Sequence, residues 1–184
     1  KDFPVIERHM NELFARGIAP LKYLFVTHQE TPHCGGLGRV LKTHPDTLLV
    51  GDVSDYHLAF PQYEQRMRWM KEGDEIDLGG RTLQVVEPVI RDLRTTWWAF
   101  DTKEKVLFPG DGFAYSHYHE DGHCGLVAEE AVSLDLPDVS STFADLALFW
   151  TKFADMNVYC DRLDHLIAQL GVRTIAPTHG LPIP

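Results

Sequence analysis

The sequence contains few cysteines, and none of them is spaced for a disulfide framework or a paired-thiol motif. Three cysteines occur in 184 residues, far apart and without a Cys-x-x-Cys motif, at Cys34, Cys124 and Cys160. Structural disulfides require paired cysteines and are typical of oxidising compartments. The cysteine content therefore indicates a reducing compartment, and we expect a cytoplasmic protein.

Long apolar runs and an excess of positive charge are also missing. No apolar run reaches the roughly 18 residues of a membrane-spanning helix, and no signal-peptide pattern opens the chain. Lys and Arg total 17 against 27 Asp and Glu, which gives a formal net charge of −10. Because a nucleic-acid backbone attracts basic surfaces, we expect no nucleic-acid partner. Because no long apolar run is present, we expect no membrane association.

What the sequence does contain is typical of a globular protein. Apolar residues make up 44% of the chain and charged residues 24%. A chain of this length can bury a sizeable core, so we expect a single domain over residues 1–184. Because the sequence begins with Lys1 rather than Met, we also expect a processed chain or a fragment.

Hydrophobic periodicity predicts alternating helices and strands, then hairpins. The predicted helices cover 4–16, 38–42, 53–70 and 143–170, and Pro61 is expected to break or start a helix within 53–70. The predicted single strands cover 21–27, 47–50 and 173–176. Hairpins are predicted over 76–85 and 97–108, and a long loop over 114–138. The alternation of helix and strand favours a layered α/β domain.

The densest group of candidate ligands follows the predicted strand 21–27. His28, Glu30 and His33 lie within six residues, before Gly35 and Gly36. If the strand continues, His28 and Glu30 share one face with Pro32. Nitrogen and oxygen donors suit a borderline or hard divalent metal. Such runs also occur by chance in loops, so this stretch alone does not decide between a metal site and an ordinary loop.

Two further donors also follow predicted strands. Asp111 comes after the second hairpin, and His179 comes after the strand 173–176. Donors at the carboxyl ends of strands can converge at one rim of a sheet, where α/β folds place their sites. The set of donors is therefore more specific than any single motif.

In this order, the motifs resemble the metallo-β-lactamase superfamily. The motifs are His28-x-Glu30-x-Pro32-His33, Gly73-Asp74-Glu75-Ile76-Asp77-Leu78-Gly79-Gly80, Leu107-Phe108-Pro109-Gly110-Asp111-Gly112-Phe113 and Ile175-Ala176-Pro177-Thr178-His179-Gly180. Glu30 and the Asp-x-Phe sequence at Asp111 resemble the branch of flavodiiron and oxygen-binding di-iron proteins. The resemblance implies an αββα sandwich with metals at the sheet edge. The first strands of that fold, before its first helix, have no counterpart here.

The resemblance also implies a set of ligands for two metal ions, with iron favoured over zinc and one ion possibly missing. His28, Glu30 and Asp111 would hold one metal. His33, Asp111 and His179 would hold the other, so that Asp111 bridges the two ions.

Two positions depart from the family pattern. The family has an Asp where Pro32 stands, and a His at the position that aligns with Arg91. Three explanations stay open: each metal keeps three protein donors with water completing the site, the site is vestigial, or other donors substitute. The substitutes considered are His117, His119, His123, Glu87 and Asp92.

Three functions follow from these alternatives. A di-iron centre would bind or reduce O₂ or NO and would require an external electron donor. A zinc centre would direct a metal-bound water at a small-molecule substrate, with Arg91 holding an anionic group. The third function is that of a non-catalytic subunit that pairs with an intact homologue, because a sheet without its first strands exposes an edge. We therefore expect a homo- or hetero-oligomer.

Overall fold

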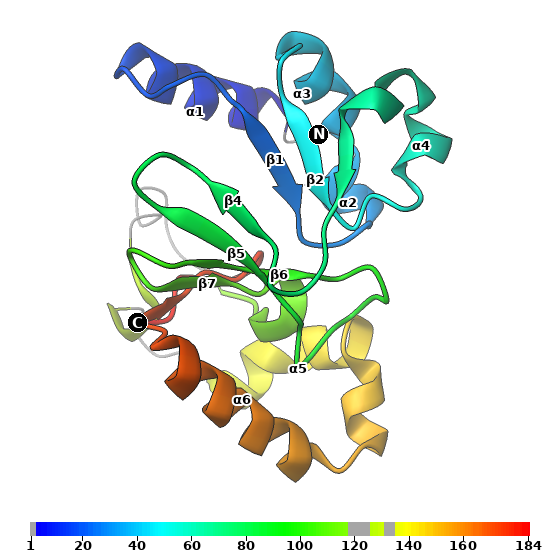
Figure 1. Cartoon of the computed structure of the whole chain (residues 1–184). Coiled ribbons are helices and arrows are strands. Elements are labelled where there is room, and N and C mark those ends of the chain that lie inside the picture. The colour runs from blue at the N-terminus through cyan, green and yellow to red at the C-terminus, as the bar shows by residue number, and fades with distance from the viewer. Residues whose placement is uncertain (1–2, 118–125, 131–134) are drawn as a thin grey trace. The chain divides into compact units, whose positions relative to one another are not determined.

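The computed structural model describes residues 3–117, 126–130 and 135–184. These residues form two compact units, Lys1–Trp69 and Met70–Pro184, each with its own sheet (Figure 1). None of the helices in the described ranges combines the length and the apolarity that crossing a bilayer requires.

The first unit contains a three-stranded parallel sheet in the order β1-β2-β3. Its strands are β1 (Tyr23–Val26), β2 (Leu48–Gly51) and β3 (Met67–Trp69). Its helices are α1 (Phe3–Ala15), α2 (Thr31–Cys34), α3 (Leu37–Thr43), α4 (Tyr56–Ala59) and the 3-10 helix η1 (Pro61–Arg66). Helices thus connect successive strands, as parallel pairing requires.

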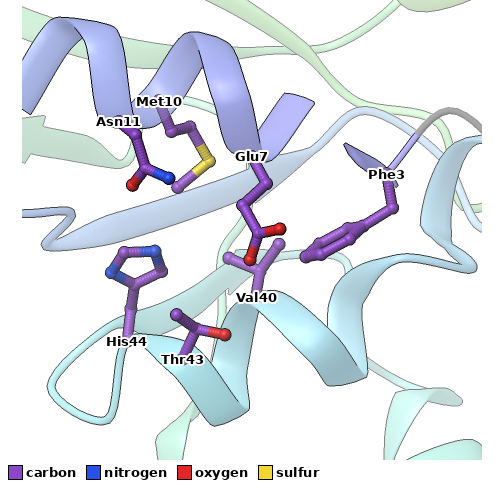
Figure 2. Close-up of a pocket in the computed structure, with 7 residues that line it drawn as sticks. All are labelled: Phe3, Glu7, Met10, Asn11, Val40, Thr43 and His44. Atoms are coloured by element: carbon purple, nitrogen blue, oxygen red, sulfur yellow. The ribbon is translucent and has the colours of Figure 1, made fainter. Parts of the chain in front are cut away.

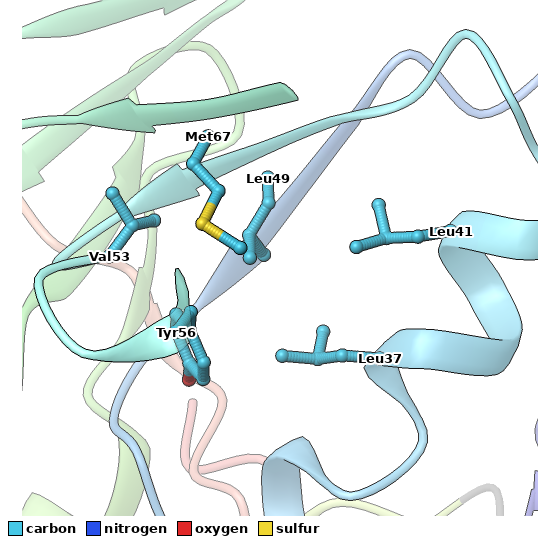
Figure 3. Close-up of a cluster of buried hydrophobic side chains, with 6 residues drawn as sticks. All are labelled: Leu37, Leu41, Leu49, Val53, Tyr56 and Met67. Atoms are coloured by element: carbon cyan, nitrogen blue, oxygen red, sulfur yellow. The ribbon is translucent and has the colours of Figure 1, made fainter. Parts of the chain in front are cut away.

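The core of this unit joins α3 to the sheet. Figure 3 shows its six buried side chains, which are Leu37, Leu41, Leu49, Val53, Tyr56 and Met67. Arg66 holds the end of α3, because its guanidinium donates to the carbonyls of Leu41 at 2.6 Å and His44 at 2.9 Å. The last carbonyls of a helix lack partners within it, so this side chain completes the hydrogen bonding of α3.

Helix α1 packs against α3 through its aromatic residues. The guanidinium of Arg39 lies 5.3 Å from the ring centroid of Phe3, and the rings of Phe14 and His44 meet edge to face at 5.6 Å. Figure 2 shows the space that remains between the helices, a pocket of about 20 Å³. A pocket of this size holds about one water molecule, so it offers no room for a ligand.

The second unit contains a five-stranded sheet in the order β4-β5-β6-β7-β8, antiparallel except for the parallel pair β7–β8. The strands are β4 (Glu75–Asp77), β5 (Thr82–Val86), β6 (Trp98–Asp101), β7 (Val106–Phe108) and β8 (Thr174–Ile175). The helices are η2 (Gly110–Phe113), η3 (Ala128–Glu130), α5 (Leu136–Leu146), η4 (Phe149–Phe153) and α6 (Met156–Leu170).

Helix α6 covers the core of this sheet. Apolar side chains of α6, including Leu163 and Ile167, pack against the buried cluster that contains Trp98, Phe100 and Leu107. The helix ends at Gly171, which adopts the left-handed conformation at φ 63° that commonly terminates helices. This end agrees with the prediction from the sequence.

Most predicted elements are present. The mixed α/β class, both hairpins and the strands that precede His28, Asp111 and His179 are confirmed. The single domain over 1–184 stays a prediction. The predicted loop 114–138 ends too late, because α5 begins at Leu136, and residues 118–125 and 131–134 of that loop lie outside the described residues.

The helix predicted over 53–70 is wrong. The segment contains the short helix α4, then η1, which begins at Pro61, and then the strand β3. Met67 pairs with Leu49 of β2 in a parallel register. This pairing is a contact between distant positions, and it overrides the local apolar spacing that predicts a helix.

The helix predicted over 143–170 is interrupted. Helix α5 ends at Leu146, Ala154 is extended, and the side chain of Asp155 caps α6 by accepting a hydrogen bond from Asn157 N. Phe149 and Phe153 are 57% and 86% exposed. The apolar residues therefore do not share one buried face, although their spacing is continuous.

Asp101 at the end of β6 organises the turn into β7. Its carboxylate accepts hydrogen bonds from the backbone N–H groups of Lys103 at 2.9 Å and Glu104 at 3.1 Å, and from Arg81 at 2.7 Å. Burial by itself raises the pKa of Asp101, but these donors outweigh burial, and the net pKa is lowered. The ionised carboxylate therefore stabilises this turn.

We predict that Asp101→Asn lowers the free energy of unfolding by about 1–3 kcal/mol at neutral pH, because charged hydrogen bonds are lost. A carboxyl group whose pKa is lower in the folded state stabilises that state when the pH is above the pKa of the unfolded chain. The stabilisation disappears as the pH falls through the pKa of the folded state. Urea unfolding of the wild type and the variant should therefore converge below about pH 3.9. Asp164→Asn, at an exposed position on α6, is the matched control. A difference that persists unchanged in acid would contradict this role.

Candidate metal site

Three of the predicted ligands lie on the short segment that follows β1. His28 and Glu30 precede α2, and His33 lies within it. The backbone N–H groups of His33 and Cys34 donate to the carbonyl of Glu30 at 2.9 and 2.8 Å. The predicted alternation along a continuing strand is therefore wrong. One helical turn, rather than an extended strand, brings Glu30 and His33 to neighbouring positions.

The three side chains converge. Oε2 of Glu30 lies 3.1 Å from Nε2 of His33 and 3.9 Å from Nε2 of His28. The two imidazole centroids are 4.5 Å apart, and candidate ligand atoms of the three residues all lie within 4.8 Å of one another. Two donors about 2.0–2.2 Å from one ion, at angles from about 90° to tetrahedral, lie about 3.0–3.5 Å apart. The separation of Glu30 and His33 matches this range, whereas the 3.9 Å between Glu30 and His28 is wider and would have to shorten around a shared ion.

His28 is oriented by the residue before it. Its side chain is fully buried, and Oγ1 of Thr27 lies 3.0 Å from its Nδ1. Because Nε2 is the nitrogen nearer Glu30, a proton on Nδ1 directed at Thr27 leaves the Nε2 lone pair for a metal. Gln29 fixes the same segment by donating from Nε2 to the carbonyl of Asp52 at 3.0 Å.

The remaining residues of this segment do not add a ligand. Pro32 lies in the first turn of α2, where the missing N–H of a proline costs no helical hydrogen bond. Burial raises the pKa of the Cys34 thiol, and this effect outweighs a hydrogen bond from Tyr56.

The second unit carries the other two predicted ligands. Asp111 lies in η2 after β7 and is 3% exposed, and the His179 side chain, after β8, is 42% exposed. Nε2 of His179 lies 3.9 Å from Oδ1 of Asp111. The two segments are joined by a hydrogen bond from Thr178 N to the carbonyl of Gly110 at 3.0 Å. The adjacent parallel strands thus bring these two residues together.

Glycines beside both residues let the backbone approach aromatic rings. A Cβ added at Gly112 would lie 2.8 Å from the indole of Trp98. A Cβ at Gly180, where φ is +99°, would lie 2.4 Å from the ring of Tyr115. The hydroxyl of Tyr115 donates to the carbonyl of Leu181 at 3.0 Å and accepts from its N–H at 2.9 Å. The turns that carry Asp111 and His179 are therefore fixed by close packing.

Arg91, predicted as a catalytic residue, forms an ion pair with Glu87. Its Nη2 lies 3.0 Å from Oε1 of Glu87. Asp92, one of the possible substitute ligands, accepts a hydrogen bond from Oγ1 of Thr96 at 2.7 Å. Of the histidines after Asp111, His117 lies with its ring 6.3 Å from that of Tyr115. His119 and His123 lie outside the described residues.

The sequence does not identify two supporting residues, Thr27 and Tyr115. Thr27 could have been suspected, because a hydroxyl next to a candidate ligand can orient it. Tyr115 carries no such signal. Its partners Gly180 and Leu181 are far away in the sequence, and their contacts depend on the parallel pairing of β7 with β8.

Comparison with known proteins identifies the family. The family model described as "ODP family beta lactamase" matches residues 1–180. The chain is 23% identical over 172 residues to a nitric oxide reductase of Moorella thermoacetica, covering 88% of this chain and 39% of that protein. It is 23% identical over 161 residues to a coenzyme F420H(2) oxidase of Methanocaldococcus jannaschii, covering 83% and 37%. The chain therefore spans less than half the length of these two relatives.

The fold agrees with solved structures. The crystal structure of the flavodiiron protein from Giardia intestinalis matches with a TM-score of 0.66 and 19% identity, over 98% of this chain and 43% of that chain. The predicted metallo-β-lactamase fold and the flavodiiron-like branch are therefore confirmed.

We predict that Gly180→Ala disrupts the turn that carries His179. A Cβ here meets the ring of Tyr115 in addition to the strain of a positive φ, whereas at Gly171, with φ 63°, nothing lies within 4 Å. Gly171→Ala is therefore the matched control, and it should lower the free energy of unfolding by about 1 kcal/mol through backbone strain alone. Gly180→Ala should lower the free energy of unfolding by about 2–4 kcal/mol, because overpacking adds to the backbone strain. Equal thermal stability of the two variants would contradict this account.

Proposed function

The chain belongs to the ODP beta-lactamase family, and on that basis we propose that it holds a non-heme di-iron centre that binds or reduces O₂ or NO. The ligands in this proposal are His28, Glu30, His33, Asp111 and His179. Two relatives support the choice of reaction, since they are named a nitric oxide reductase and a coenzyme F420H(2) oxidase.

One observation carries the proposal, the convergence of His28, Glu30 and His33. The short turn of α2 places a carboxylate between two imidazoles at distances of 3.1 and 3.9 Å. Imidazole and carboxylate together suit iron or zinc. The contact of Thr27 with Nδ1 of His28 supports the proposal, because it leaves Nε2 on the side of the carboxylate.

The second group of donors completes the proposal. Following the family resemblance, Asp111 is assigned as the bridging carboxylate and His179 as a ligand of the second ion. The buried carboxylate of Asp111 would contribute negative charge that offsets two dications, and such compensation is what makes a buried carboxylate acceptable. When bound, an iron pair would supply Lewis acidity and would pass on electrons that an external donor provides.

The protein's own residues control access to the site. Glu30 is the exposed ligand of its group, since its side chain is 48% exposed while those of His28 and His33 are 0% and 14% exposed. Solvent and small molecules therefore reach this group from the side of Glu30. With Pro32 in place of a carboxylate, the site offers fewer protein ligands, and such open sites leave positions for water or substrate.

Reduction of O₂ or NO needs an external electron donor as a partner, whereas reversible binding of either molecule does not. We propose a cytoplasmic protein on the basis of its cysteine content, and a homo- or hetero-oligomer. A zinc-dependent hydrolase that uses Arg91 for an anionic substrate is the second candidate, and identification of the bound metal separates the two.

We predict that the protein, loaded anaerobically with Fe(II) and freed of excess metal, retains about two iron ions per chain. His179→Ala and Asp111→Ala should each lower the iron content by at least about half, because both serve the same pair of ions. His44→Ala is the control, since His44 packs against Phe14 at the end of α3. Elemental analysis measures the metal, and the visible spectrum on addition of NO reports its binding. Equal loss in all three variants, or retention of zinc alone, would refute the proposal.

We also predict that Pro32→Asp raises the affinity for iron. An Asp at this position restores the donor that the family has there, and a carboxylate is favourable in the first turn of a helix. The dissociation constant for Fe(II) should fall by about tenfold or more, as expected for one added charged ligand. Pro45→Asp, beyond the end of α3, controls for the added negative charge and should leave the affinity unchanged. An unchanged affinity in Pro32→Asp would show that the missing donor is not limiting.

A further inference from the structure

The second unit contains a pocket that the proposed metal centre does not use. It has a volume of about 430 Å³ and lies between residues 87–94, which follow β5, and the helices η4 and α6. Pockets of about 300–1,000 Å³ are typical of small-molecule sites. The charged and aromatic residues of its lining are Glu87, Arg91, Asp92, Arg94, Trp150, Tyr159 and Arg162.

The pocket concentrates positive charge in an acidic chain. Arg91, Arg94 and Arg162 all line it, although the net charge of the chain is −10. Arg91 is engaged by Glu87 at 3.0 Å. Within the described ranges of the chain, neither Arg94 nor Arg162 forms an ion pair or a side-chain hydrogen bond. Two guanidinium groups are therefore available to a ligand.

Two aromatic rings form another part of the lining. Trp150 and Tyr159 lie with their ring centroids 5.1 Å apart at an angle of 58°. The indole N–H of Trp150 donates to the carbonyl of Arg91 at 2.9 Å. Because this bond occupies its polar group, Trp150 can offer a ligand only the surface of its ring. Its bond to Arg91 also holds residues 87–94 against η4.

We propose that this pocket binds a phosphate monoester that carries a flat aromatic ring, as a nucleoside monophosphate does. Arg94 and Arg162 recognise the dianionic phosphate, since guanidinium groups match phosphate oxygens in geometry and charge. Trp150 and Tyr159 contact the ring. The site does not rest on the proposed metal centre, and it adds a ligand class that O₂ or NO chemistry does not require.

Titration calorimetry with adenosine monophosphate, on metal-free and on iron-loaded protein, tests this proposal. Adenosine and inorganic phosphate separate the contributions of the ring and the anion, and benzoate tests a carboxylate in place of the phosphate. We expect adenosine monophosphate to bind at least about tenfold more tightly than any of these three, because it alone satisfies both parts of the pocket. The indole N–H signal of Trp150, assigned with Trp150→Phe, should shift in NMR spectra on binding.

Three substitutions in the pocket are expected to change the affinity for adenosine monophosphate, two of them downward and one upward. Arg94→Gln and Arg162→Gln should each weaken binding about tenfold, as expected for loss of one charged hydrogen-bond donor. Glu87→Gln should strengthen binding about threefold, because it releases Arg91 from its ion pair. A variant that merely disturbs folding would not increase affinity.

Arg173→Gln is the matched control, since Arg173 is exposed and lies outside the lining of the pocket. Its effect should be less than about twofold, which corresponds to loss of nonspecific attraction alone. No binding of adenosine monophosphate at millimolar concentration, or equal weakening by Arg173→Gln and Arg94→Gln, would overturn the proposal. Phosphate or benzoate binding as tightly as adenosine monophosphate would overturn it as well. If adenosine monophosphate binds equally well to metal-free and iron-loaded protein, this site is independent of the proposed di-iron centre.

Discussion

The second unit depends on the close approach of glycine backbone to two aromatic rings. Trp98, fully buried in β6, leaves no space for a Cβ at Gly112, and Tyr115 leaves none at Gly180. Each glycine directly follows a predicted metal ligand, Asp111 or His179. Because protein interiors are close-packed, such contacts have discrete arrangements and resist small displacement. The positions of the carboxylate and the imidazole are thus set by core packing, which the hydrogen bond between Thr178 and Gly110 then links across the two strand ends.

In the first unit, backbone hydrogen bonding rather than core packing positions the candidate ligands. Glu30 is extended and accepts hydrogen bonds from two N–H groups of the turn that follows it, so its own side chain and that of His33 point to neighbouring positions. This arrangement explains how Pro32 is tolerated inside a ligand motif. A proline in the first turn of a helix preserves the turn that positions Glu30 and His33, while it removes a carboxylate from the segment. Geometry and ligand number can therefore change independently at this site.

The sequence predicts the elements whose signals are local. The hairpin around Gly79 and the end of α6 at Gly171 follow from turn chemistry, and both are present. The strand β3 and the break between α5 and α6 were missed for different reasons. Pairing of Met67 with Leu49 is a long-range contact, whereas the break at Ala154 could have been suggested by Asp155, a residue type that favours helix starts. The candidate ligands are found from the sequence because motifs mark them. Tyr115 is not, because its role exists only once β7 and β8 are adjacent.

The charge of the chain bears differently on the two kinds of ligand. An excess of acidic residues favours cations in general, so a cation site needs geometry to become selective, and the proposed site has the carboxylate of Glu30 between two imidazoles. An anion site in the same chain must first overcome repulsion. The pocket between β5 and η4 is lined by three arginines and by the two carboxylates of Glu87 and Asp92. Glu87 pairs with Arg91, Asp92 accepts a hydrogen bond from Thr96, and Trp150 fixes the backbone at Arg91, so one positive charge remains in excess. A pocket with two uncommitted guanidinium groups in an acidic protein is therefore a specific feature of residues 87–94, and it does not follow from the family's metal ligands.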